Sequence, residues 1–413
     1  MALIKNCEIT KIYDSRGTPT VCVDIYTTEA HGYGQAPSGA STGKYEVFAY
    51  PNNDIDLGIK RFKESVIPAL LKNEFNTQSE FDNLLHELDG TKNFSNLGGN
   101  ITTAASIAWA KTLSKIRKQS IYEYFVEEVK PQIPYPVGNV INGGRHAIGS
   151  TDIQEYLAIP LTRDARKAIE GNIAVHRKVG TLLKKKFPYE PLGRGDEGGW
   201  VAKLTNMEAL DLFATVCREI SDNMNIEIRP GLDLAASEFY RNGKYHYRER
   251  TLSQNEQIEF IVELIKKFNL FYVEDPLEQE DFEGYARLMD KIKDAGLKTN
   301  IVGDDIFVTN PERIQKGISM GACNAVLIKV NQIGTITDTL KAIKLARSAN
   351  YNYIISHRSG ETTDNFIAHL AVGTASLGIK TGVLGGERMA KLNELIKISE
   401  RLSSSKSKNK KGE

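Results

Sequence analysis

The sequence predicts an α/β protein with a smaller α+β domain over residues 1–125 and an α/β barrel over residues 136–402. Three observations lead to this fold class. The chain has 413 residues, enough for roughly two or three domains. Pro131, Pro134 and Pro136 break regular structure between the two parts. Beyond them, short apolar runs alternate with amphipathic helical patterns, which is typical of βα units.

The N-terminal part mixes strands and helices. The alternating stretch Thr20-Val-Cys-Val-Asp-Ile-Tyr26 predicts a strand. Residues 55–71 and 78–88 predict helices, and an alanine-rich helix is expected over residues 102–117.

In the barrel, strands are expected to end at residues 271–275, 301–305, 325–329 and 353–357. Helices lie between them and begin with recognisable signals. Ser253-Gln-Asn-Glu256 is a capping box. Asn310 and Pro311 supply an N-cap and a first-turn proline. Residues 163–187 predict a long helix with one apolar face.

Composition excludes several classes of protein. A net charge of +1 gives no reason to expect binding to nucleic acid or to an anionic membrane. The four cysteines form no CxxC pair, so neither a zinc site nor a disulfide framework is indicated. We find no secretion signal and no membrane-spanning run. We therefore expect a cytoplasmic protein, with a secondary cell-surface or secreted pool left open.

The last residues, 403–413, read SSSKSKNKKGE. They contain no apolar side chain and predict a disordered tail. A plain solvated tail is favoured over one that binds acidic partners.

Each predicted barrel strand is followed by a residue capable of chemistry. The steps between these residues are 41, 30, 25, 28 and 23 positions, and the residues are Asp233, Glu274, Asp304, Lys329, His357 and Lys380. A βα unit takes about 30 residues, so we expect one such residue per unit, at strand ends that meet on one face of the barrel. A single aspartate after a strand is as readily a helix cap. Six residues in register, one of them a lysine after an apolar strand, favour an active site.

The three carboxylates would converge on one point, which requires a cation or raised pKa values. Oxygen ligands without cysteine suit a hard ion such as Mg²⁺. His146 and His357 could also be ligands. Their separation and the lack of an HExxH pattern favour catalytic or substrate contacts instead.

Two glycine-containing loops are ambiguous. Gly193-Arg-Gly-Asp-Glu-Gly198 fits the GxGxxG pattern, but no clear strand precedes it and two acids stand where a pyrophosphate would lie. A dinucleotide site is therefore not expected. Pro37-Ser-Gly-Ala-Ser-Thr-Gly43 is either a turn or a lid that closes over a ligand.

At this point the chain resembles the enolase family along nearly all of its length, up to about Leu402. The matching segments are highly specific together and weak singly. They are Asp14-Ser-Arg-Gly17, Ser38-Gly-Ala-Ser-Thr-Gly43, Asn142-Gly-Gly-Arg-His146, Ile153-Gln-Glu155, Gly195-Asp-Glu-Gly-Gly199, Gly231-Leu-Asp-Leu-Ala-Ala-Ser-Glu-Phe239, Val273-Glu-Asp-Pro276, Gly303-Asp-Asp305, Leu327-Ile-Lys-Val-Asn-Gln-Ile-Gly334, Ser356-His-Arg-Ser-Gly-Glu-Thr362 and Lys380-Thr-Gly382.

The resemblance implies reversible dehydration of 2-phospho-D-glycerate to phosphoenolpyruvate by an enzyme of enolase-type barrel fold with two Mg²⁺ ions per active site. Asp233, Glu274 and Asp304 would bind the tighter ion. Ser41, on the loop that precedes Gly43, would help to bind a second ion that arrives with substrate.

The resemblance also implies which side chains transfer protons. Lys329 would take the C2 proton, and Glu197, with Glu155 beside it, would protonate the departing C3 hydroxyl. Two cations and Lys380 would stabilise the added negative charge. Because Lys329 must be neutral to act as a base, nearby cations are expected to lower its pKa.

The remaining implied roles concern substrate binding. Lys380 and Gln154 would contact the substrate carboxylate region, Arg358 and Ser359 would hold the phosphate, and the pocket would be completed by His146, Ser356 and His357. An arginine beside a serine suits a phosphate.

The chain departs from the family pattern in small ways. Ser150 stands where an Asn is common, Gly385-Gly-Glu-Arg388 replaces the usual Ser-Glu-Arg, and Leu392 stands where Tyr is frequent. None of these changes removes a residue assigned to chemistry. Two other functions stay open: a related enzyme that abstracts a proton beside a different carboxylate, and a non-catalytic surface-binding protein. The resemblance implies at least a homodimer, with an octamer possible.

Overall fold

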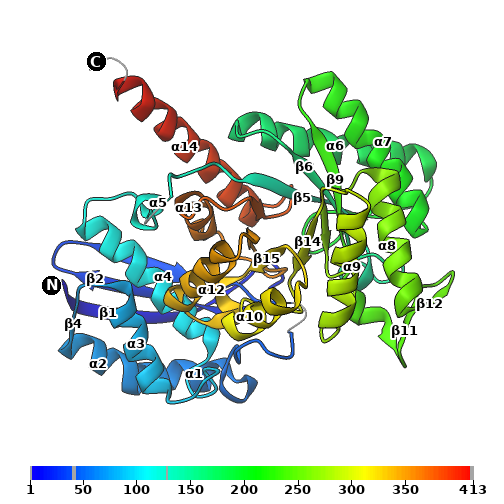
Figure 1. Ribbon diagram of the computed structural model, residues 1–413. Coiled ribbons are helices and arrows are strands. Elements are labelled where there is room, and N and C mark those ends of the chain that lie inside the picture. The colour runs from blue at the N-terminus through cyan, green and yellow to red at the C-terminus, as the bar shows by residue number, and fades with distance from the viewer. Residues whose placement is uncertain (1, 40–42, 127–128, 410–413) are drawn as a thin grey trace.

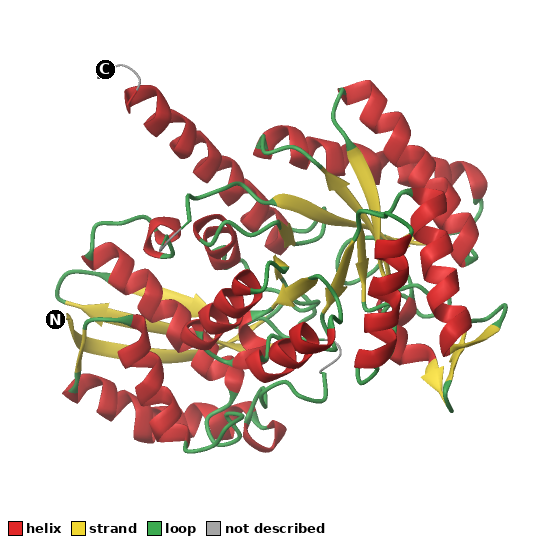
Figure 2. Ribbon diagram, in the orientation of Figure 1, coloured by secondary structure: helices red, strands yellow, loops and turns green. Residues whose placement is uncertain are grey.

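The computed structural model describes residues 2–39, 43–126 and 129–409, with side chains described between residues 3 and 404 of those ranges. Two parts of the chain lie side by side (Figure 1). The N-terminal elements, blue to cyan, pack against one side of a barrel formed by the later elements. The barrel strands are surrounded by helices (Figure 2).

The N-terminal part is a four-stranded antiparallel sheet covered by helices. The strand order is β3-β2-β1-β4. The strands are β1 (Ala2–Tyr13), β2 (Pro19–Thr27), β3 (His31–Gln35) and β4 (Glu74–Phe75). The strand predicted at residues 20–26 is thus confirmed as part of β2.

One helical stretch, α1 (Ile55–Arg61) to α2 (Ile67–Lys72), lies between β3 and β4, and three helices follow β4: α3 (Gln78–Asp89), α4 (Gly99–Ile116) and α5 (Ile121–Tyr124). The single helix expected over residues 55–71 is interrupted by a π-helical turn, Phe62–Val66. Pro68 lies in the first turn of α2 and has no amide proton to donate backwards, which accounts for the wider turn. Helix α4 is buried along most of its length, because it packs between the sheet and the barrel.

Among the described residues, eight strands close the barrel in the order β5-β6-β9-β13-β14-β15-β16-β17, with β17 paired to β5. Their bounds are β5 Tyr135–Asn142, β6 Glu155–Pro160, β9 Ile228–Asp233, β13 Tyr272–Glu274, β14 Asn300–Gly303, β15 Ala325–Ile328, β16 Asn352–Ser356 and β17 Gly378–Lys380. The predicted α/β class and barrel are confirmed.

The barrel helices are α6 (Ala165–Lys186), α7 (Asn206–Met224), α8 (Gln254–Phe268), α9 (Phe282–Asp294), α10 (Pro311–Met320), α11 (Val330–Ile333), α12 (Ile336–Ser348), α13 (Phe366–Gly373) and α14 (Gly386–Asn409). The capping box of Ser253 and Glu256 and the N-cap of Asn310 are present as predicted.

The barrel departs from uniform βα units at its start. Strand β6 follows β5 directly and runs antiparallel to both of its neighbours, β5 and β9. The chain then needs two helices, α6 and α7, before β9 can continue in the common direction. As a result the N-terminal end of β6 and the loop between α6 and α7 lie on the face where the other strands have their C-terminal ends. The register shows this directly, because Glu155 at the start of β6 pairs with Asp233 at the end of β9.

The period of two along a strand sets which side chains enter the barrel. Tyr272, Leu327 and Ile354 belong to an apolar cluster in the interior. Two positions further along each of these strands come Glu274, Lys329 and Ser356. The functional side chains therefore form the next layer of the barrel interior, on the side of the C-terminal strand ends.

One backbone contact ties the two parts together beside that layer. Ser38 and Gly360 donate their amide protons to each other's carbonyl oxygen, at 2.8 and 2.9 Å. A side chain at Gly360 would collide with Asp14 and Ser38, so the close approach requires glycine.

The C-terminal helix projects away from the barrel (Figure 1). Composition predicts disorder from residue 403, whereas the backbone of α14 is helical to Asn409. Extending an existing helix costs far less than starting one. Within the described ranges, no helix combines the length and the apolar character that crossing a bilayer requires.

Candidate active site

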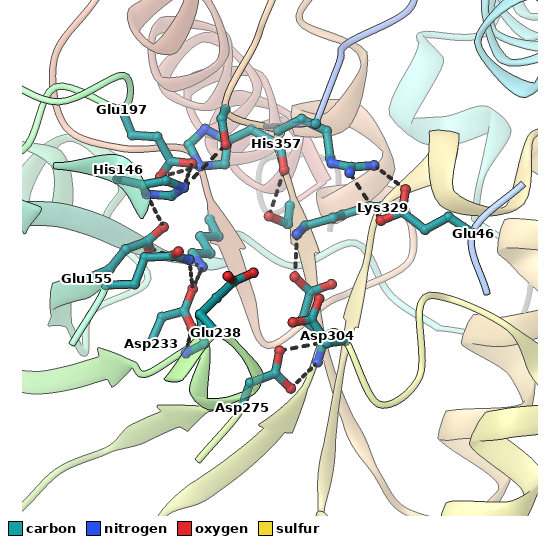
Figure 3. Close-up of a pocket in the computed structure, with 18 residues that line it drawn as sticks. Glu46, His146, Glu155, Glu197, Asp233, Glu238, Asp275, Asp304, Lys329 and His357 are labelled. Atoms are coloured by element: carbon teal, nitrogen blue, oxygen red, sulfur yellow. Dashed lines mark hydrogen bonds and ion pairs between the residues drawn. The ribbon is translucent and has the colours of Figure 1, made fainter. Parts of the chain in front are cut away.

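A polar cavity of about 40 Å³ opens at the C-terminal ends of the barrel strands (Figure 3). It collects almost every described residue that the sequence singled out: His146, Gln154, Glu155, Glu197, Asp233, Asp304, Lys329, Ser356, His357, Arg358, Ser359 and Lys380. Glu274 is fully buried beside it, in contact with Lys380. Ser41 lies outside the described residues.

Lys380 is the centre of the carboxylate cluster. Its Nζ lies 2.8 Å from Glu274 Oε2 and 3.1 Å from both Asp233 Oδ2 and Glu155 Oε2. Burial disfavours the ammonium, but Asp233, Glu155 and Glu274 outweigh it and hold the pKa of Lys380 well above its ordinary value. Burial and the proximity of Asp233 raise the pKa of Glu274 well above its usual range. This is a site that favours positive charge.

Lys329, at the end of β15, forms an ion pair with Asp304. Gln332 Nε2 donates to the other oxygen of that carboxylate at 2.9 Å. Burial lowers the pKa of Lys329, but the neighbouring carboxylates, Asp304 before Glu274, together outweigh it, so the pKa lies above the ordinary value. The sequence argument predicted a lowered pKa. That lowering by bound cations stays a prediction, and the carboxylate in contact with the amine acts in the opposite direction.

A second acidic group faces Lys329 across the cavity (Figure 3). His146, Glu155 and Glu197 place their polar atoms within 4.8 Å of one another. His146 Nδ1 lies 3.3 Å from Glu155, and Asn139 Nδ2 donates to Glu197 Oε2 at 3.2 Å.

The two carboxyls of this group titrate in opposite directions. Burial and the charge of Glu197 raise the pKa of Glu155. Burial also disfavours the ionised form of Glu197, but His357 and His146 outweigh it and keep its pKa well below the usual range. Of the two carboxyls, Glu155 is therefore the one whose protonated form the site favours.

His357 lies at the end of β16, with Nε2 3.2 Å from Glu197 Oε2. Burial lowers its pKa to about 4, so the ring is neutral near pH 7. Ser356 Oγ donates to the carbonyl of His357 at 3.0 Å, and Ser359 Oγ lies 3.4 Å from His146 Nε2.

Arg358 is held from the N-terminal part of the chain. Its guanidinium contacts Glu46 through Nη1 at 2.9 Å and Nη2 at 3.2 Å, and Asn331 Oδ1 at 3.0 Å. Glu46 also accepts the amide proton of Gly43 at 2.8 Å. Sequence reasoning missed Glu46, which follows no strand and is recognisable only when the two parts are docked.

Sequence reasoning also gave no role to three more acids that line the cavity, Glu238, Asp275 and Asp305. Asp275 and Asp305 each directly follow a predicted metal ligand, and both stand in the quoted motifs. Asp275 accepts the amide protons of Asp304 and Asp305 at 3.1 and 2.8 Å, which fixes the turn that carries Asp304.

The residues present fit a divalent metal ion. Glu274, Asp275 and Asp304 offer oxygens within 4.8 Å of one another, and Asp233 is joined to Glu274 by Lys380. All these donors are carboxylate oxygens, the ligands of a hard cation. The raised pKa of Glu274 has the same origin, since crowded carboxylates require positive charge.

Comparison with known protein families decides the relationship. The model of the enolase C-terminal TIM barrel domain matches residues 130–412, and the model of the enolase N-terminal domain matches residues 4–125. The chain belongs to the enolase family. The resemblance found in the sequence motifs is confirmed, and with it a hydro-lyase that uses a metal cofactor.

Archaeal members of the enolase family are similar over almost the whole chain. The protein named Enolase from Methanothermobacter thermautotrophicus is 46% identical over 407 residues, which cover 97% of each chain. The one from Picrophilus torridus is 45% identical, over 97% of this chain and 99% of its own. The one from Archaeoglobus fulgidus is 42% identical, over 96% and 97%.

Proposed function

We propose that this chain catalyses the reversible, Mg²⁺-dependent dehydration of 2-phospho-D-glycerate to phosphoenolpyruvate in glycolysis and gluconeogenesis. The observation that carries the proposal is the pairing of a lysine with two carboxylates across one cavity. Lys329 lies on one side and Glu155 with Glu197 on the other (Figure 3). The acidic cluster, which is Asp233, Glu274 and Asp304, lies beside them in contact with Lys380 and Lys329. Such an arrangement can remove a proton from one carbon and assist departure of a hydroxyl from the next.

Asp233, Glu274 and Asp304 are the residues that we propose hold the tighter Mg²⁺. Asp275 is the less suitable ligand, because both of its oxygens already accept backbone amide protons. The metal, when bound, stabilises negative charge on the substrate carboxylate. Ser41, for which the described residues give no position, is proposed to help bind a second Mg²⁺.

Lys329 is proposed to take the C2 proton of the substrate. It can do so only as a neutral amine, so its ion pair with Asp304 must be weakened first. A ligand that engages the Asp304 carboxylate removes the interaction that raises the pKa of Lys329.

Glu197 and Glu155 are proposed to supply the proton to the departing C3 hydroxyl, which leaves as water. Their opposite pKa shifts make Glu155 the easier of the two to protonate and Glu197 the easier to ionise. His357 and His146 keep the Glu197 carboxylate in place.

The rest of the cavity is proposed to bind the substrate. Arg358 and Ser359 would hold the phosphate, and Arg358 would exchange part of its pairing with Glu46 for it. Lys380 and Gln154 would contact the carboxylate region, where Lys380 already forms ion pairs with three acids. His146, Ser356 and His357 would complete the wall.

The test is an assay of purified protein with 2-phosphoglycerate, with and without Mg²⁺. We expect phosphoenolpyruvate to form with Mg²⁺ and its formation to stop on addition of EDTA. Restoration by added Mg²⁺ is the control for irreversible damage. No product, or product formation that EDTA leaves unchanged, would refute the proposed reaction.

Three further proposals complete the description. The domains divide into residues 1–125 and 136–402, the protein resides in the cytoplasm, and it assembles as a homodimer or a higher homo-oligomer such as an octamer. Light scattering of the purified chain measures its mass in solution, and a monomer would contradict the last of these.

A further inference from the structure

Arg388, near the start of α14, is a charged side chain with no exposed surface. Its guanidinium lies directly behind the cavity wall. Nη1 donates to His357 Nδ1 at 2.8 Å and to the carbonyl of Arg358 at 2.7 Å. Nη2 donates to the carbonyls of Ser359 at 2.6 Å and Asp196 at 3.2 Å. A buried charge of this kind is costly unless it is compensated by hydrogen bonds, and four of them are made by the two Nη atoms.

The contact with His357 determines which ring nitrogen carries the proton. A guanidinium has only donors and does not lose its proton in a protein. His357 Nδ1 must therefore be the acceptor in that hydrogen bond, and the ring proton must be on Nε2. A proton on both nitrogens would place two N–H groups against each other at 2.8 Å.

The Nε2 proton faces the acid group. Glu197 Oε2 lies 3.2 Å from Nε2, although the alignment is not yet that of a hydrogen bond, and Nε2 has no aligned partner among the described residues. Hydrogen bonds at active sites are often poorly aligned before substrate binds and tighten with it.

We propose that Arg388 is a positioning residue for the dehydration step: it fixes His357 as the neutral Nε2–H tautomer, so that His357 can only donate to Glu197. The same guanidinium ties the loop that carries Glu197, through Asp196, to the segment that carries Arg358 and Ser359. The acid and the phosphate-binding groups are thus held in one frame. The catalytic meaning of this role rests on the proposed function, while the tautomer itself does not.

The charges that face His357 are Glu197, Arg388 and Glu361, and together with burial they hold its pKa at about 4. Arg388 is the cation in this set. Without Arg388, the carboxylates of Glu197 and Glu361 would favour the imidazolium. That form donates from both ring nitrogens, so Glu197 would no longer face the only N–H of the ring.

The first experiment uses the unmodified chain, labelled with ¹⁵N-histidine, without substrate. Long-range proton–nitrogen correlation spectra report which ring nitrogen is protonated, and the signal that disappears in His357→Gln identifies His357 among the seven histidines. We expect His357 to be protonated at Nε2 alone, unchanged from about pH 8 to about pH 5.5. A proton on Nδ1, or an imidazolium at neutral pH, would overturn the proposal whatever the activity of the protein.

The second experiment removes the donors with Arg388→Met. We expect His357 to titrate with a pKa closer to 6.5, and kcat to fall about 10- to 100-fold, as is typical when a partner that orients a functional histidine is lost. Arg388→Lys should restore part of both.

The matched control is Lys391→Met, which removes another buried cation of α14. Lys391 pairs with Glu361 at 2.7 Å and touches no nitrogen of His357. We expect this variant to keep the Nε2–H tautomer at neutral pH, because Arg388 still donates to Nδ1 even though Glu361 has lost its cation. If Arg388→Met folds and still shows only that tautomer over the whole pH range, Arg388 does not set it. If Arg388→Met does not fold, the spectrum of the unmodified chain decides.

Discussion

Replacing Lys329 and replacing Glu197 should impair different steps of the reaction, because the two side chains act on different bonds of the substrate. Lys329→Ala should abolish exchange of the substrate C2 proton with solvent, with a loss of at least about 10²–10⁴-fold. Glu197→Gln should retain that exchange while formation of phosphoenolpyruvate falls by a similar factor. Exchange is followed by NMR in deuterated water and dehydration by absorbance. Retained exchange in Lys329→Ala would refute its role as the base, and equal loss of both activities in Glu197→Gln would refute its role as the acid.

Site residues could be predicted from the sequence where they follow the regular spacing of the barrel strands. Strand spacing alone located Asp233, Glu274 and Lys329, since parallel strands end on one face of a barrel. It did not locate Glu155 or Glu197, which family resemblance supplied. Strand β6 is reversed, so Glu155 stands at the start of a strand, and Glu197 lies in a loop that resembled a nucleotide-binding pattern.

Helix α6 should make the stability of the protein sensitive to acid. His176 is buried on α6 beside Trp200, with Nε2 2.8 Å from the carbonyl of Gly198. Burial lowers its pKa from 6.5 to about 4. Between these values the unfolded chain takes up a proton that the folded protein refuses, so stability is complete above about pH 6.5 and falls as the pH drops toward 4, by at most about 1.4 kcal/mol per pH unit.

Urea unfolding at pH 7 and pH 5 measures this effect. His176→Gln should lower the free energy of unfolding at both pH values and reduce the difference between them. His246→Gln, at an exposed position of the strand Lys244–His246, serves as the control and should leave the difference unchanged. A His176→Gln protein with the full pH dependence of the parent would show that the acid sensitivity arises elsewhere.

Elements with strong local signals were predictable, and those set by tertiary context were not. The N-cap residues Ser253 and Asn310 predict the starts of their helices from the sequence alone. The reversal of β6 has no such signal, because a strand of the sequence Glu-Tyr-Leu-Ala-Ile-Pro is equally buried in either direction. The π-helical turn at residues 62–66 depends on one proline, whose effect on the helix is not seen in the periodicity of apolar residues.

At the scale of the whole molecule, a buried ion pair links the two domains. Lys111 of α4 lies 2.7 Å from Asp364 of the barrel, with side-chain exposures of 6% and 5%. Asp364 also accepts the amide proton of Gln35 at 3.1 Å and that of Phe366 at 2.9 Å. Lys111→Met leaves this carboxylate buried without its cation, and we expect a loss of about 3–5 kcal/mol in the free energy of unfolding.

The double variant Lys111→Met with Asp364→Asn removes both charges and retains an acceptor for one of the two amides. The double variant should recover part of the loss, because no uncompensated charge stays buried, and a double-mutant cycle of urea unfolding measures the recovery. Strict additivity of the two single variants would contradict a direct coupling across the interface. Such contacts between residues hundreds of positions apart were beyond sequence reasoning, since no local pattern tells which surfaces dock.

The backbone pairing of Ser38 with Gly360 also bears on when the protein becomes functional during its synthesis. Gly360 follows Ser38 by 322 positions, so at about 5–20 residues per second the ribosome adds it roughly 16–64 s later. Throughout that interval the N-terminal domain can be complete, but the segment that bears Arg358 and Ser359 does not yet exist to meet it. A nascent chain released early would therefore carry the acidic cluster without the wall opposite, and the active site is among the last parts of the molecule to be assembled.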